Sequence, residues 1–117
     1  MGLFSKKEYI YTEIKLNDLL PIGSIVKITG DENLYIIHNY RGIKKHPQKP
    51  KTYIEVDYWC YRYPYGDYPA IMENGYEPIN IGINQTDIQE VIFVGYSTEE
   101  RLELLTSVEK LENGKKN

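Results

Sequence analysis

The stretch TYIEVDYWCY, residues 52–61, is the longest segment of the chain that is typical of a β-strand. Successive side chains of a strand point to opposite faces of a sheet. The face predicted to turn inward is apolar and carries Ile54, Val56, Tyr58 and Cys60. The opposite face begins polar with Glu55 and Asp57 and ends aromatic with Trp59 and Tyr61. The stretch therefore predicts a long, half-buried strand and a mainly β fold.

Aromatic residues continue beyond this strand. In RYPYGDYP, residues 62–69, Tyr63 prolongs the outward row before Pro64 and Gly66 end the strand. Rings with polar tips are frequent at the centres of protein interfaces, because they bury a large area at a small cost in conformational entropy. We therefore predict a partner-binding aromatic edge made of Trp59, Tyr61, Tyr63, Tyr65 and Tyr68. The alternative interpretation is that a C-terminal helix covers this face.

Shorter strands are predicted on both sides of the long one. Val26 and Ile28 turn inward in the first of them, and a GDEN turn precedes the second. The NQTD segment at 84–87 is predicted to be a turn or one turn of helix. The predicted short strands cover residues 24–29, 34–40, 79–83 and 90–95.

The period of the apolar residues changes near the C-terminus. Ser97 with Glu100 forms a capping-box pattern, and Asn113-Gly114 supplies a stop. Between them, one helical arc carries Leu104, Leu105, Val108 and Leu111. We predict a mainly β, α+β fold: a small antiparallel sheet or partly open barrel of about five to six strands with one C-terminal amphipathic helix. The expected organisation is a single domain over residues 1–117, with a β core at 16–96 and the helix at 97–113.

The composition limits the classes of function. The 117 residues suit one domain, and a net charge of −3 argues against a general nucleic-acid binder, which usually has a basic excess. The one cysteine, Cys60, cannot form an internal disulfide, which is typical of a reducing compartment. The N-terminal segment has no apolar run typical of a signal peptide, and Val91–Val94 is far too short to span a bilayer. We expect a cytoplasmic protein without an integral membrane segment.

Candidate catalytic and metal-binding side chains are few. His38, His46 and Cys60 do not have the spacing of metal ligands, so we expect no metal and no cofactor. The sequence shows neither a Ser/His/Asp order nor a glycine-rich loop before a helix. Cys60 is interpreted as a small core residue and His38 as a packed or edge residue. The alternative is an enzyme that uses Cys60 or His38.

A basic segment, RGIKKHPQKPK at residues 41–51, is predicted to be an exposed loop. Five of its eleven residues are basic and none is acidic. Such a patch would attract a phosphate or a lipid headgroup. The candidate anion patch consists of Arg41, Lys44, Lys45, Lys49 and Lys51. The alternative interpretation is a solvated loop whose charges only keep it in water.

Four segments occur in an order that resembles a known family. They are LLPIGSIVKITG (19–30), YIIHNY (35–40), DYWCYRYPYG (57–66) and DIQEVIFVGYSTEE (87–100). Over roughly residues 16 to 105 the chain is similar to a small bacterial family, domain-of-unknown-function family 4176. Two features depart from the family pattern: Cys60 stands where a small residue, commonly glycine, is usual, and the basic segment is particular to this chain.

The resemblance implies a genomic neighbourhood rather than an activity. Genes of this family often lie beside type VII secretion systems and LXG-type toxins, and the family offers no catalytic residue to carry over. We therefore expect a non-catalytic accessory or adaptor protein that binds another protein, either a toxin or a secretion component of the same locus. The alternative is an immunity protein that neutralises a cognate secreted toxin. A homodimer is a further way to cover the aromatic edge.

Overall fold

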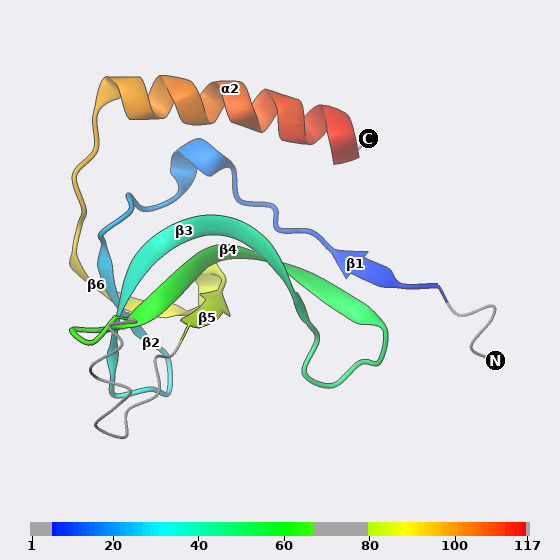
Figure 1. The fold of residues 1–117 in the computed structure, drawn as a ribbon, viewed down its shortest axis with the longest axis horizontal. Helices are drawn as coiled ribbons and strands as arrows, with labels where there is room; N and C mark the ends of the chain where they lie inside the picture. Colours follow the sequence, from blue (N-terminus) through cyan, green and yellow to red (C-terminus); the bar gives the residue numbers. More distant parts are fainter. Residues whose placement is uncertain (1–5, 67–79, 117) are drawn as a thin grey trace.

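The computed structural model describes residues 6–66 and 80–116 (Figure 1). Within these residues, the strands are β1 (Glu8–Ile10), β2 (Ile25–Ile28), β3 (Leu34–Lys45), β4 (Thr52–Tyr63), β5 (Asn80–Ile83) and β6 (Ile88–Phe93). Two 3-10 turns, η2 (Leu16–Asp18) and η3 (Gln85–Asp87), and the α-helix α2 (Glu99–Lys116) complete the described elements. The prediction of a mainly β fold with a C-terminal helix is confirmed.

All the described strands belong to one mixed sheet with the order β1-β4-β3-β2-β6. β4 is flanked on both sides, because β3 pairs along one side of it while β1 and β5 pair along the two halves of the other side. The β1–β4 pairing is parallel and the other pairings are antiparallel. The sequence predicts that the β core begins at residue 16, whereas the sheet already includes β1 upstream of that residue.

β3 and β4 form one long curved ribbon (Figure 1), paired from Leu34 opposite Tyr63 to Lys45 opposite Tyr53. The prediction that residues 41–51 form an exposed loop is therefore wrong for its first half. β3 continues to Lys45, and only the residues between β3 and β4 form the turn. Arg41 adopts a positive φ of 55°, so a loop-like residue interrupts β3 without ending it.

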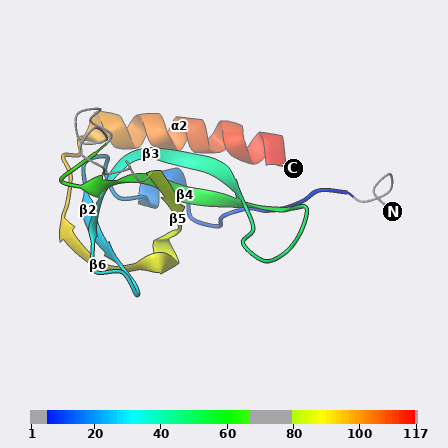
Figure 2. The same ribbon diagram turned by 60° about the horizontal axis from the view of Figure 1, so that its bottom comes forward.

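The core gathers on one face of this sheet. Tyr58 and Cys60 of β4 are fully buried in this core, as the alternation predicts. Val56 is also fully buried, but it lies outside the cluster, where its Cγ1 and the Trp59 ring both lie close to Gly82. Viewed from a second direction (Figure 2), β2 and β6 curve round from β3 and β4, so the sheet is partly rolled. The buried cluster consists of Leu16, Leu19, Val26, Tyr35, Ile37, Tyr58, Cys60 and Ile83.

Helix α2 begins two residues and ends three residues later than expected from the sequence. Thr98, rather than Ser97, provides the capping side chain, because its Oγ1 accepts a 3.1 Å hydrogen bond from the Arg101 amide. At the other end the helix continues through Asn113 and Gly114 to Lys116. A cap satisfies one of the free amides of the first helical turn, which fixes where the helix starts.

The helix packs on the core side of the sheet, beside η2 (Figure 1). Leu105 and Val108 contact the buried cluster. Leu104 and Leu111, which are predicted in the same arc, are instead 64% and 67% exposed. The stripe that faces the sheet is therefore narrower and more polar than predicted. Arg101 belongs to it and donates hydrogen bonds to the Leu19 carbonyl at 3.2 Å and to the Tyr40 hydroxyl at 2.5 Å.

Candidate protein-binding surface

The face of the sheet opposite the buried cluster carries an apolar band. Directly opposite residues on antiparallel neighbours lie on the same face, with Cβ atoms about 5 Å apart. The register places Phe93 of β6 opposite Ile25 of β2, and Ile25 opposite Ile36 of β3. Ile36 in turn lies opposite Tyr61 of β4. These four side chains therefore cross four strands in one row, and none of them is buried.

A second row runs beside the first. Leu34 lies between Lys27 of β2 and Tyr63 of β4, and Lys27 lies opposite Glu90 of β6. Phe93 is 56% exposed and Tyr63 is 41% exposed, so the rings of both rows reach the solvent. We call this surface the outer face, and it consists of Ile25, Lys27, Leu34, Ile36, Trp59, Tyr61, Tyr63, Glu90 and Phe93.

Trp59 is fixed at one end of the outer face. Its Nε1 donates a 2.9 Å hydrogen bond to the Arg41 carbonyl. A Cβ added at Gly42 would lie 2.0 Å from Nε1, and one added at Gly82 would lie 3.1 Å from the ring. The two glycines, on β3 and β5, therefore form the floor on which the indole lies. Trp59 is a half-buried part of the sheet as well as a ring of the outer face.

The structure brings together part of the predicted partner-binding site. Trp59, Tyr61 and Tyr63 alternate along β4 and share the outer face. Tyr65 lies beyond the end of β4, with its ring centroid 5.3 Å from the guanidinium carbon of Arg62. Tyr68 lies outside the described residues. The prediction of an aromatic edge is wrong in one respect: β3 and β5 flank β4 on both sides, so these rings belong to a face.

Sequence reasoning assigned six members of the outer face to no binding site: Ile25, Lys27, Leu34, Ile36, Glu90 and Phe93. They come from strands that are distant in the sequence, and the position of Phe93 also depends on a β2–β6 register shift between Ile25 and Val26. One signal was available. The run LYII at 34–37 is apolar at every position, and a strand that is apolar on both faces indicates that both faces need covering.

His38 and Cys60 lie on opposite faces of the sheet. The His38 ring stacks on the Tyr61 ring with centroids 3.8 Å apart, and its Nε2 lies 2.9 Å from Asn80 Oδ1. Cys60 is buried, as predicted, and burial raises the pKa of its thiol to about 12. The two side chains therefore do not form a nucleophile–base pair.

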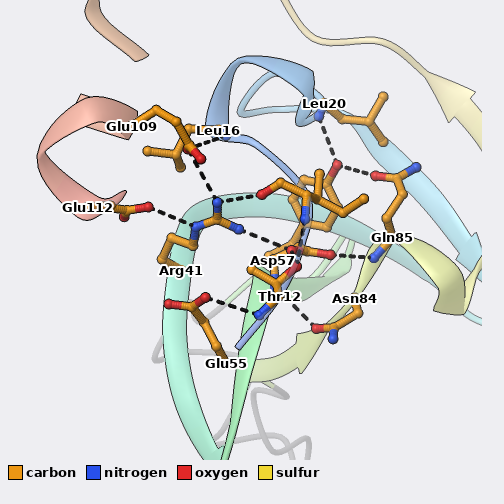
Figure 3. A network of polar contacts seen from close by, with 12 residues as sticks. Thr12, Leu16, Leu20, Arg41, Glu55, Asp57, Asn84, Gln85, Glu109 and Glu112 are labelled. Carbon is orange, nitrogen blue, oxygen red and sulfur yellow. Dashed lines mark hydrogen bonds and ion pairs between the residues drawn. The ribbon is translucent and has the colours of Figure 1, made fainter. Parts of the chain in front are cut away.

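Arg41 anchors a polar network between α2 and the sheet (Figure 3). Its guanidinium lies 3.1 Å from Asp57, 3.5 Å from Glu109 and 3.4 Å from Glu112. It also donates a 2.6 Å hydrogen bond to the Ile14 carbonyl. Two of the carboxylates come from α2 and one from β4, so Arg41 ties the helix to the sheet. Its side chain is only 11% exposed, which makes its predicted place in an exposed anion patch wrong.

Asp57 is the buried end of this network (Figure 3). Its carboxylate accepts hydrogen bonds from the Thr12 hydroxyl and, at 2.8 Å, from the Gln85 amide. Its own amide donates to Asn84 Oδ1 at 3.2 Å. Asp57 lies between the stretches of β4 that pair with β1 and with β5. Loops complete the hydrogen bonding of β4 there, which is why Asp57 is buried although the alternation predicts that it points outward.

Two other features, a metal-binding cluster and a membrane-spanning helix, are absent from the described part of the chain. Within residues 6–66 and 80–116, no group of three or more His, Cys, Asp or Glu side chains could hold a metal ion. In the same ranges, no helix combines the length and the apolar character needed to cross a membrane.

The geometry defines a small mainly β domain, with a helix packed on one face of an open mixed sheet and an apolar band on the other. The chain belongs to the family described as Domain of unknown function (DUF4176), whose model matches residues 19–104. This match confirms the resemblance carried by the four sequence segments. No curated protein and no solved structure matches the chain.

Proposed function

We propose that this protein is a non-catalytic accessory protein that binds another protein through its outer face. The observation that carries the proposal is the band of Phe93, Ile25, Ile36 and Tyr61, whose members lie at paired positions on four neighbouring strands. The band lies opposite the face on which α2 packs. Contiguous exposed apolar surface on a soluble domain is typical of an interaction site.

The chemistry of the outer face fits a protein partner. Aromatic rings are enriched at interface centres, and charged residues are common at the rim. Tyr61 and Tyr63 supply rings, while Lys27 and Glu90 supply opposite charges toward the β2–β6 side. A sheet face of this composition suits another folded surface or an amphipathic helix.

The partner that the family resemblance suggests is a toxin or a secretion component encoded at the same type VII secretion locus. An adaptor role and an immunity role differ in which part of that partner is bound. An adaptor would bind a targeting region of the secreted protein, whereas an immunity protein would bind the toxic domain. Enzymatic use of Cys60 with His38 has no geometric support, because the sheet separates the two side chains.

Co-expression with each protein encoded beside its gene, followed by hydroxyl-radical footprinting of any complex, tests this proposal. We expect Tyr63 and Phe93 to lose reactivity in the complex. Leu104 and Leu111 on α2 are similarly exposed and provide an internal control, because they should stay reactive. Protection of the two leucines with unchanged reactivity of Tyr63 and Phe93 would contradict the proposal.

A further inference from the structure

A pocket at the β3–β4 turn is separate from the outer face. It has a volume of about 350 Å³ and is lined by Lys45, His46, Lys49, Pro50, Lys51, Thr52 and Tyr53. None of these residues is acidic, although the chain as a whole has a net charge of −3. The turn projects from the far end of the β3–β4 ribbon, away from α2 (Figure 1). The pocket is therefore a local concentration of positive charge on an acidic protein.

The basic side chains of residues 41–51 differ in whether their charged groups contact other groups of the protein. Arg41 is held by three carboxylates, and Lys44 Nζ donates a 2.7 Å hydrogen bond to the Gly82 carbonyl. Lys45, Lys49 and Lys51 are exposed. Among the described residues, none of these three makes an ion pair. These three lysines, and neither Arg41 nor Lys44, line the pocket.

His46 adds a positioned donor. Its Nδ1 accepts hydrogen bonds of 3.0 Å from the amides of Gln48 and Lys49. Nδ1 must therefore hold a lone pair, and the neutral ring carries its proton on Nε2. These contacts and the 2.8 Å bond from the His46 amide to the Thr52 carbonyl give the turn a defined shape. The lining of the pocket thus includes three lysines and a histidine whose neutral ring carries an N–H on Nε2.

We propose that this pocket binds a phosphoryl group. A phosphoryl group carries up to about two negative charges and three strong acceptor oxygens, and lysine is a common partner for it as a point charge. The charged side chains of the pocket are all cationic donors, so its electrostatics match such a group. The group is carried either by a soluble phosphorylated molecule or by the headgroup of an anionic lipid, and both present the same chemistry to the pocket.

Titration of the full-length protein with inorganic phosphate, followed by amide chemical shifts at constant ionic strength, tests the proposal. We expect saturable shifts confined to the turn and its two flanking strand ends. The Lys45→Gln/Lys49→Gln variant should lose at least about tenfold in affinity, which is about 1.4 kcal/mol. The matched variant Lys15→Gln/Lys110→Gln has the same net charge and should bind as the parent does. Equal responses of the two variants would overturn the proposal, as would unsaturable shifts together with a lack of vesicle binding in the sedimentation experiment described below.

A His46→Asn variant separates the ring from the general charge. The Asn side-chain oxygen can still accept from the two turn amides, but the Nε2 donor is lost. We expect affinity for inorganic phosphate to fall about tenfold or more, as for one lost hydrogen bond to a charged group. Unchanged affinity would remove His46 from the site and contradict the arrangement proposed here.

Sedimentation with vesicles distinguishes the two sources of the phosphoryl group. Phosphatidylcholine vesicles that contain phosphatidic acid are compared with pure phosphatidylcholine vesicles. Binding to the anionic vesicles that is lost in Lys45→Gln/Lys49→Gln and kept in Lys15→Gln/Lys110→Gln indicates a lipid headgroup. Saturable phosphate binding without vesicle binding indicates a soluble ligand. Absence of binding to both probes would overturn the proposal.

Discussion

The Trp59 indole packs against the backbone of β3 and β5. Gly42 on β3 and Gly82 on β5 leave room for the indole, and the Arg41 carbonyl accepts its N–H at 2.9 Å. An indole held in this way gives the central strands a rigid surface at one end of the outer face. At the residue scale, the outer face is therefore partly built by positions that have no side chain.

Gly42→Ala should destabilise the protein. The new Cβ would lie 2.0 Å from Trp59 Nε1, so the indole must move and lose its hydrogen bond. Overpacking of this kind costs about 1–3 kcal/mol of unfolding free energy, which a urea titration measures. Gly114→Ala is the control, because a Cβ there meets nothing within 4 Å and should be neutral or stabilising. Equal stability of Gly42→Ala and the parent would contradict the close packing of Trp59 against Gly42.

Cys60 should react slowly with a thiol reagent. Its ionisation should also lower the free energy of unfolding at alkaline pH. Burial raises the pKa of the folded thiol to about 12, whereas the unfolded thiol ionises near about 8.5. The stabilisation is complete below the unfolded pKa and is lost as the pH rises from there toward the folded pKa, by up to about 1.4 kcal/mol per pH unit. Urea titrations at about pH 8 and about pH 10 measure this loss. Cys60→Ala should show a smaller loss, and an identical loss in both proteins would contradict it.

At the scale of elements, α2 is attached as much by charge as by apolar contact. Leu105 and Val108 reach the core, while Arg101 and the carboxylates of Glu109 and Glu112 supply polar contacts. The Glu109 carboxylate also accepts a 2.7 Å hydrogen bond from the Leu16 amide. The helix therefore stabilises η2 and the N-terminal segment together with the sheet.

Arg41→Met should loosen this assembly. It removes the positive charge beside Asp57, whose side chain is 1% exposed, and an uncompensated buried charge costs about 3–5 kcal/mol. Urea unfolding measures the cost, and hydrogen exchange shows whether the amides of α2 lose protection first. Glu112→Gln removes a partner that is 25% exposed and should cost less than about 1 kcal/mol. An Arg41→Met protein as stable as Glu112→Gln would contradict the central role of Arg41.

Alternation along the sequence was sufficient to predict strands that bury one face, such as residues 52–61, and the helix that follows the sheet. It could not predict β1, because three residues that are exposed and pair in parallel with Thr52–Ile54 have no local signature. The continuation of β3 beyond Arg41 was also missed. There, pairing with β4 outweighs a local composition that favours a loop. Pairing with β4 determines both β1 and the continuation of β3, and the local sequence of neither segment indicates that pairing.

At the scale of the whole molecule, the two faces of the sheet have different roles. One face is covered by η2 and α2 over the buried cluster. The outer face carries an apolar band with exposed rings at Phe93 and Tyr63. The rings on β4 could be predicted from their spacing. The side chains of the outer face on β2, β3 and β6 could not, because strand pairing brings them beside β4 and a β2–β6 register shift sets Phe93 opposite Ile25.

The affinity of the partner protein for two matched double variants tests the outer face most directly. Tyr63→Ala/Phe93→Ala removes two exposed rings from the outer face, and Leu104→Ala/Leu111→Ala removes two exposed side chains from α2. With a partner identified among the proteins encoded beside the gene, isothermal titration should show that the first variant loses about 1–3 kcal/mol per anchor. Its unfolding free energy should stay within about 1 kcal/mol of the parent, and the second variant should bind as the parent does. Unchanged affinity of Tyr63→Ala/Phe93→Ala, with lost affinity of Leu104→Ala/Leu111→Ala, would contradict the assignment of the binding surface.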